Sequence, residues 1–144
     1  MSFRFVVCPE THAVLAVAGD VLDVAALVDV ARSTVDHPDF QSTMRQLVFI
    51  PASSEVRLSG ADLRAFAERP PIFAPSSRRA IVAEPASVGF GVSRMFEIMK
   101  DGLAGEILVT SDVTEACRHV DLDMRDVDAL LAGLLEFAVW PRRA

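Results

Sequence analysis

The sequence predicts one α/β domain: a mostly parallel, five-stranded sheet with an N-terminal hairpin, helices on its faces and an extra C-terminal helix. One observation behind this prediction is size, since 144 residues, 51% of them hydrophobic, make one domain with a substantial core. Another is that short valine-rich runs alternate with segments of helical periodicity, as in sheets whose parallel strands are joined by helices. Furthermore, no internal repeat and no domain boundary interrupts residues 1–144.

The first half of the chain is predicted to form three strands and two helices. Residues 3–8 and 12–18 form the hairpin, and Asp20 caps the helix that follows. The inward stripe of this helix is Val24, Leu27, Val28, Ala31 and Val35. Residues 46–50 form a buried strand. A second helix begins at Ser59, because Ser59-Gly60-Ala61-Asp62 is a capping sequence, and it ends before Pro70.

The second half continues the alternation. Residues 79–83 form a strand, residues 84–100 contain a helix, and residues 106–110 form the last strand. Asp112 then caps a short helix with an apolar face of Val113, Ala116, Cys117 and Val120. Residues 122–144 are an appended segment whose helix runs from about Asp123 to Trp140.

Composition and charge exclude several kinds of function. A net charge of −6 leaves no basic surface for a phosphate backbone, so no nucleic acid partner is expected. No apolar run approaches the roughly 20 residues that span a bilayer, and the N-terminus does not read as a signal peptide. Cys8 and Cys117 lie far apart in sequence and are expected to be free, buried thiols. The predicted location is the cytoplasm.

Three segments carry a family resemblance. They are AVAGDVLDVAALVDVARSTVDHPDF, RRAIVAEPASVGFGVSRMFEIM and GEILVTSDVTEACRHV. Across roughly residues 3–120 the chain resembles the bacterial SpoIIAA-like small proteins of the STAS and SEC14 type. The resemblance implies the α/β fold of anti-sigma-factor antagonists and, as in most SpoIIAA-like members, no assigned reaction.

The resemblance also makes Ser59 a candidate phosphoacceptor. In the true antagonists, a partner kinase phosphorylates a serine within Asp-Ser-[Ser/Thr]-Gly, at the start of the helix after the third strand. Here Arg57-Leu58-Ser59-Gly60 keeps the serine and glycine but lacks the aspartate. The residues themselves favour a plain N-cap, in which the hydroxyl accepts one backbone N–H and contributes ~1 kcal/mol.

Gly89-Phe90-Gly91, together with Arg94, is a candidate ligand turn. A dinucleotide turn has the pattern Gly-x-Gly-x-x-Gly after a strand, and Arg94 stands where the third glycine belongs. The alternative is that the glycines let the helix approach the sheet closely. Its buried stripe is then Val88, Val92, Met95, Phe96 and Met99. The missing glycine favours this packing interpretation.

No catalytic residue, metal site or cofactor is predicted. Cys117, His119, Asp121 and Asp123 alternate, but side chains two residues apart diverge on a helix. Cys117 is therefore expected in the core and His119 at the surface. His12 and His37 lack a recognisable nucleophile motif near them.

Three functions are open from the sequence. The leading hypothesis is a non-catalytic STAS-like module that acts through a protein partner or a small bound ligand. The alternative is a protein that binds a lipid or another apolar small molecule, from the SEC14 part of the resemblance and the apolar helix faces over the sheet. The third is a nucleotide-dependent enzyme built on the Gly89 turn.

The appended helix predicts a contact surface. Its stripe includes Val127, Leu130, Leu131, Leu134 and Leu135. We expect it to pack partly on its own domain and partly across a homodimer interface, with Trp140 near the rim. The alternative is that it covers an exposed edge of the sheet.

Overall fold

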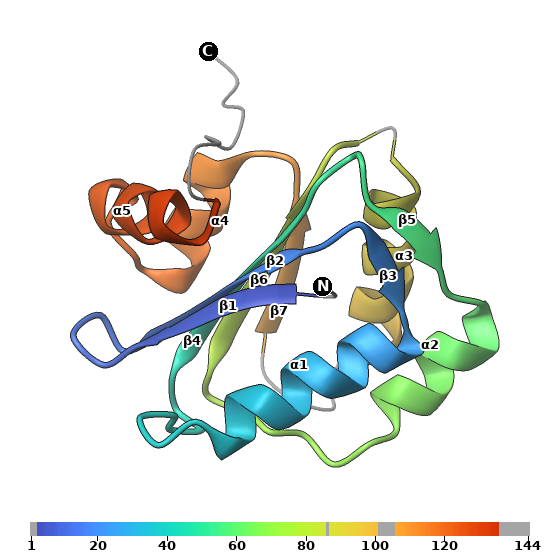
Figure 1. Ribbon diagram of the computed structural model, residues 1–144, viewed down its shortest axis with the longest axis horizontal. Helices are drawn as coiled ribbons and strands as arrows, with labels where there is room; N and C mark the ends of the chain where they lie inside the picture. The colour runs from blue at the N-terminus through green and yellow to red at the C-terminus, as the bar shows by residue number, and fades with distance from the viewer. Residues whose placement is uncertain (1–2, 86, 101–105, 136–144) are drawn as a thin grey trace.

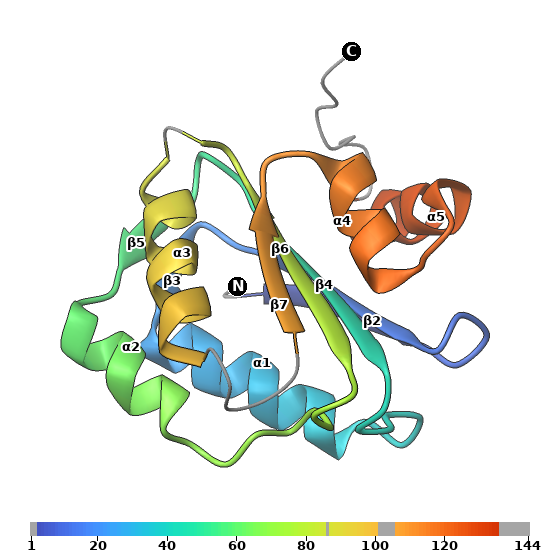
Figure 2. The same cartoon turned by 180° about the vertical axis from the view of Figure 1, so that it is seen from behind.

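The computed structural model describes residues 3–85, 87–100 and 106–135 and shows an α/β domain built on a five-stranded sheet (Figures 1 and 2). The sheet order is β1-β2-β4-β6-β7. These strands are β1 (Phe3–Cys8), β2 (Ala13–Ala18), β4 (Arg45–Ile50), β6 (Arg78–Ala83) and β7 (Glu106–Thr110). The sheet is mixed, because β1 is antiparallel to β2 while the other neighbouring pairs are parallel. The predicted hairpin and five strands are confirmed, whereas the sheet is mixed and not strictly mostly parallel as predicted, because the hairpin places an antiparallel strand at its edge.

Helices cover both faces of the sheet. One face carries α1 (Val24–Asp36), α2 (Gly60–Ala67) and α3 (Val88–Lys100), and the other carries α4 (Val113–Val120) and α5 (Met124–Leu135) (Figure 1). The α4–α5 face has one continuous core. Its strand residues alternate along β2, β4 and β6, and they pack against the inner faces of the two helices: Ala13, Leu15, Val17, Leu47, Phe49, Ala80, Val82, Val113, Ala116, Cys117, Val120, Val127 and Leu131.

The face under α1, α2 and α3 has a divided core. One cluster gathers where β2, β4 and β6 end, at Ala18, Ile50 and Ala83. A second lies toward the starts of β2 and β4, around Val14, Met44 and Phe73. Since each strand points alternate side chains to this face, the residues between the two clusters are available to line a separate space.

A second, two-stranded sheet was not predicted. β3 (Val21–Asp23) pairs in parallel with β5 (Glu55–Arg57), in a region expected to be helix start and loop. The predicted cap at Asp20 is wrong for this reason: the chain stays extended up to Asp23, whose carboxylate accepts a hydrogen bond from the backbone N–H of Ala26. Three-residue strands carry too little periodicity to be recognised.

The buried faces of α1 and α3 differ from the predicted stripes. Val24 and Val35 of α1 and Val88 and Met95 of α3 are exposed, with 37%, 47%, 66% and 43% of their surface accessible. Thr34 and Ser93 are buried instead. The predicted apolar face of α4 is confirmed at all its positions, Val113, Ala116, Cys117 and Val120. Met99 falls among side chains outside the described ones.

The α5 helix packs on its own domain. Val127 and Leu131 are buried in the core of the α4–α5 face, and Leu130 and Leu134 pack against it while partly exposed. Arg4 of β1 donates a 2.9 Å hydrogen bond to the carbonyl oxygen of Leu134. The intramolecular half of the prediction is thus confirmed. The homodimer stays a prediction, and Trp140 and the side chain of Leu135 lie outside the described part of the chain.

Two further sequence predictions can be located in the structure. Cys8 and Cys117 are both free, as predicted, and Cys117 is buried; the prediction that Cys8 is buried is wrong, because this residue is partly exposed. Among the described residues, no helix combines the length and apolar character needed to cross a membrane.

Candidate functional site

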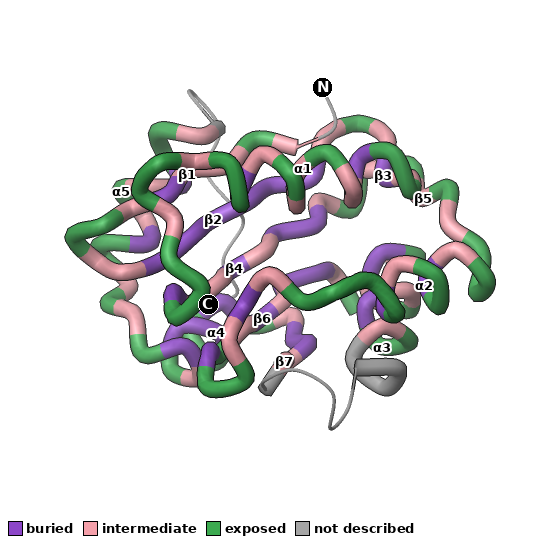
Figure 3. Tube along the Cα trace, turned by 90° about the horizontal axis from the view of Figure 1, so that it is seen from below, coloured by how far each residue is buried: buried purple, intermediate pink, exposed green. Residues whose placement is uncertain are grey.

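An apolar cavity of about 410 Å³ lies between the sheet and the three helices α1, α2 and α3. Viewed from below, α1 runs along one side of this face, α2 and α3 run along the other, and the central strands lie between them (Figure 3). α1 contacts β1, whereas α3 contacts β6 and β7. The cavity occupies the space over the middle of the sheet, where the core is divided.

The cavity floor consists of alternate residues from neighbouring strands. One row across the sheet aligns Ala16 with Val48 and Val48 with Ile81. The next row aligns Gln46 with Arg79, and Arg79 with Ile107. All of these side chains line the cavity. The small side chain of Ala16 leaves room above the sheet, and the second row contributes the polar groups of the floor.

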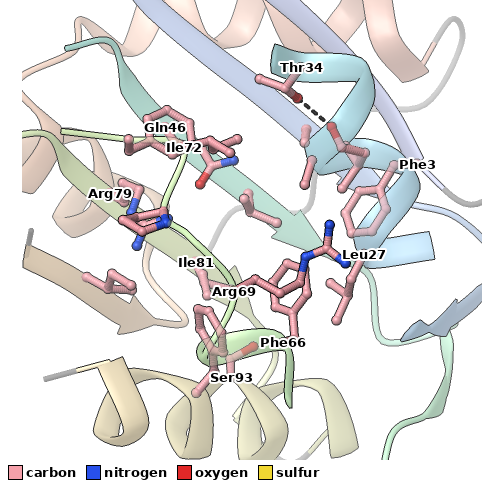
Figure 4. A pocket seen from close by; sticks show the side chains of 18 of the residues that line it. Phe3, Leu27, Thr34, Gln46, Phe66, Arg69, Ile72, Arg79, Ile81 and Ser93 are labelled. Atoms are coloured by element: carbon pink, nitrogen blue, oxygen red, sulfur yellow. Dashed lines mark hydrogen bonds between the residues drawn. The ribbon is translucent and has the colours of Figure 1, made fainter. Parts of the chain in front are cut away.

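The helical walls are apolar even where they contain hydroxyl groups. Leu27 of α1, Phe66 of α2 and Ser93 of α3 surround the same space (Figure 4). The Thr34 hydroxyl donates to the Val30 carbonyl oxygen at 2.6 Å, and the Ser93 hydroxyl donates to that of Gly89 at 2.7 Å. Because both hydroxyl protons are used within their own helices, these walls present mainly carbon surface to the cavity.

The cavity meets solvent between the second half of α1 and the segment after α2. The lining residues that are exposed mark this mouth, and they are Arg32, Val35, Asp36, Arg69, Pro70 and Pro71. The side chain of Arg69 reaches from the end of α2 across toward Leu27 of α1 (Figure 4). The mouth therefore carries charges of both signs, while the interior is largely apolar.

Arg79 is the only charged residue among the described strand residues that line the cavity. Its guanidinium carbon lies 5.2 Å from the centre of the Phe73 ring, within the range of a cation–π contact. Its Nε is buried and has no hydrogen-bond partner among the described residues. Burial lowers the pKa of Arg79 to about 10, so the side chain remains charged at neutral pH.

Ser59 has the predicted capping role. Its hydroxyl accepts the backbone N–H of Asp62 at 3.0 Å, and the Asp62 carboxylate accepts the backbone N–H of Ser59 at 2.9 Å. These two bonds form a complete capping box at the start of α2. Ser59 is also exposed, and its role as a phosphoacceptor stays a prediction.

Gly89, Phe90, Gly91 and Arg94 all lie inside α3, after a turn in which Ser87 accepts the backbone N–H of Phe90 at 3.1 Å. A Cβ atom at Gly89 would lie 2.7 Å from Cγ2 of Ile50, so this glycine does let the helix approach the sheet. Gly91 has no such neighbour within 4 Å among the described residues. Phe90 packs against the cluster around Ile50, and Arg94 is exposed.

The remaining candidates are dispersed. Cys117 is in the core and His119 is partly exposed at the end of α4. His12 contacts the Thr43 hydroxyl at 2.9 Å, and the His37 ring packs edge-on against Phe5. Among the described residues, no group of three or more His, Cys, Asp or Glu side chains could hold a metal ion.

Sequence reasoning missed Arg79 and the cavity around it. A signal was present: in a strand covered on both faces, Arg78 and Arg79 must point to opposite sides. Arg78 reaches the carbonyl oxygen of His119 at 3.3 Å on the α4 side, which leaves Arg79 facing the other helices. The distance between those helices could not be read from the sequence.

The chain matches no family model, no curated protein and no solved structure.

Proposed function

We propose that the protein binds an apolar small molecule in the cavity between α1, α2, α3 and the sheet. The observation that carries the proposal is the division of the core on this face around a space of about 410 Å³. This volume falls within the roughly 300–1,000 Å³ typical of small-molecule sites. Its lining is mostly aliphatic and aromatic, and its mouth opens to solvent beside α1.

The energetic cost of leaving this space empty supports an occupant. Empty apolar cavities cost roughly 24 cal/mol per Å³, so about 410 Å³ corresponds to at most about 10 kcal/mol, the limit in which no water enters through the mouth. That cost is comparable to the roughly 5–15 kcal/mol by which a whole domain is stable. Water is a poor substitute beside the helical walls, because it needs polar partners that these carbon surfaces do not offer; the floor row of Gln46 and Arg79 is where it would find them.

The experiment reduces the cavity volume by placing a larger side chain on α1. Ala31 lies on the cavity side of α1 and lines it, so Ala31→Phe should occupy part of the space. Ala25 is exposed on the same helix, and Ala25→Phe is the matched control. We expect the neutral, solvent-sensitive dye Nile red to bind the wild type and Ala25→Phe, and to bind Ala31→Phe about tenfold more weakly or worse.

Fluorescence titration measures the binding, and thermal unfolding shows whether each variant is folded. Equal dye affinity for Ala31→Phe and Ala25→Phe, with both variants folded, would show that the dye does not enter the cavity. No saturable dye binding by the wild type would also count against the proposal.

The second candidate is the predicted STAS-like interaction module, and one observation favours it. Val88 and Met95 are exposed and seven residues apart on α3, so they lie on one side of the helix. An exposed apolar pair of this kind suits a contact with a partner protein. Because this function needs no cavity, Ala31→Phe should leave it intact, which separates the two candidates.

A further inference from the structure

Arg79 differs from the other strand residues of the cavity floor because its side chain is charged and faces the helices α1, α2 and α3. Its neighbours across the sheet are Gln46 on β4 and Ile107 on β7. The Phe73 ring packs near its guanidinium, and Nε faces no acceptor among the described residues. Among the described residues no ion pair joins Arg79 to a carboxylate, and burial lowers its pKa.

Such a side chain has binding capacity that the described part of the fold does not use. A guanidinium presents five N–H donors in a planar fork, and an aromatic ring stabilises its charge without accepting those bonds. A buried charge is costly when it has no anionic partner. An acidic group entering the cavity would supply both the negative charge and the acceptors.

We propose that Arg79 binds the acid group of the cavity's ligand, and that this ligand is an amphiphilic carboxylic acid with a long apolar chain. This inference rests on the proposed function and adds the chemical class of the ligand. The apolar chain would lie against the carbon surface of α1, α2 and α3, and the carboxylate would face Arg79. A carboxylate matches the guanidinium fork through two parallel hydrogen bonds.

A single acid group fits the charges of the floor. Arg79 alone supplies positive charge among the described strand residues of the lining, so one negative charge balances it. The Gln46 side chain, aligned with Arg79 on the adjacent strand, offers amide N–H donors beside it. A phosphate dianion would leave one charge uncompensated on the floor.

The competing location for an acid group is the mouth. Arg32 and Arg69 are exposed there, and Asp36 lies with them. Solvent screens charges at such a position, so an ion pair at the mouth discriminates weakly between an acid and a neutral ligand. Substitution of Arg69 therefore separates binding at the mouth from binding at the floor.

The test compares two probes of equal chain length, dodecanoic acid and dodecanol, by isothermal titration calorimetry at neutral pH. We expect the wild type to bind the acid about tenfold more tightly than the alcohol or better, because only the acid pairs with the guanidinium. Arg79→Met should remove this preference while keeping affinity for the alcohol. Arg78→Met, on the opposite face of β6, and Arg69→Met should both retain it.

Each outcome has a defined meaning. Equal affinity of the wild type for the two probes overturns the role of Arg79 while leaving the apolar site intact. Loss of the preference in Arg69→Met but not in Arg79→Met places the acid group at the mouth and also overturns it. If neither probe nor Nile red binds, the proposed function itself has failed. Should Arg79→Met not fold, as judged by circular dichroism, Arg79→Gln removes the same charge and is subject to the same criteria.

Discussion

Arg79 combines a charge with a position that an aliphatic residue would fill more stably. Its two neighbours of the same face along β6, Ile81 and Ala83, are both apolar. The Phe73 ring offsets part of the cost of burying the guanidinium, but Nε, which has no hydrogen-bond partner among the described residues, retains its desolvation penalty. A residue that lowers stability in this way is typical of a binding site.

The first stability prediction therefore concerns Arg79 in the ligand-free protein. Arg79→Met should raise the free energy of unfolding by roughly 1–3 kcal/mol, because it removes a buried, uncompensated charge and keeps a long apolar stem. Urea unfolding of the ligand-free protein measures this. Arg78→Met, which loses one exposed hydrogen bond to the His119 carbonyl oxygen, should stay within about 0.5 kcal/mol of the wild type. A destabilised Arg79→Met would mean that the described fold already satisfies the guanidinium.

At the scale of helices, Thr34 and Ser93 explain why the buried faces of α1 and α3 differ from the predicted apolar stripes. Apolar periodicity assigns polar residues to the outer face, yet both hydroxyls donate to a carbonyl oxygen four residues earlier in their own helix. Such a residue can be buried with its donor satisfied, and a neighbouring valine or methionine turns outward. In α4, where the inward positions are all apolar, the same reasoning identified the buried face correctly.

Alanine substitutions at two glycines of α3 should change the stability of the protein in opposite directions. Gly89→Ala gains helix propensity of up to about 1 kcal/mol, but its methyl group would overlap Ile50, and overpacking costs roughly 1–3 kcal/mol. We expect a net loss of about 1 kcal/mol at Gly89. Gly91→Ala meets no described atom within 4 Å and should stabilise the protein by about 0.5–1 kcal/mol. Chemical denaturation of the two variants checks the signs, and a stabilising Gly89→Ala would show that the helix can move away from β4.

At the scale of the whole molecule, local sequence patterns were sufficient to predict the sheet and the helices that cover it, but they were insufficient to predict the cavity. Valine-rich runs such as that of β2 identify strands, and capping residues such as Ser59 and Asp112 locate helix starts. The cavity depends on how far α1 stands from α3 across the sheet, which no local pattern encodes. The one sequence signal of the site was the inward arginine of β6, whose meaning depends on knowing that both faces of the sheet are covered.

The last prediction asks whether the α5 stripe belongs to one chain or to two. Leu131 is 4% exposed within its own domain, so Leu131→Ala should cost about 2–4 kcal/mol through a cavity inside a single chain. A loss of this origin is independent of protein concentration, whereas an interface residue stabilises more as concentration rises. Urea midpoints measured at two concentrations 100-fold apart, with light scattering referenced to the 15.6 kDa chain, separate the two cases.

Leu134, which is partly exposed, is the matched control: if a homodimer forms through α5, Leu134→Glu should reduce the measured mass to that of one chain and leave the fold intact. A concentration-dependent midpoint that Leu131→Ala abolishes would instead place Leu131 between two subunits, because burial inside one domain cannot depend on a second chain.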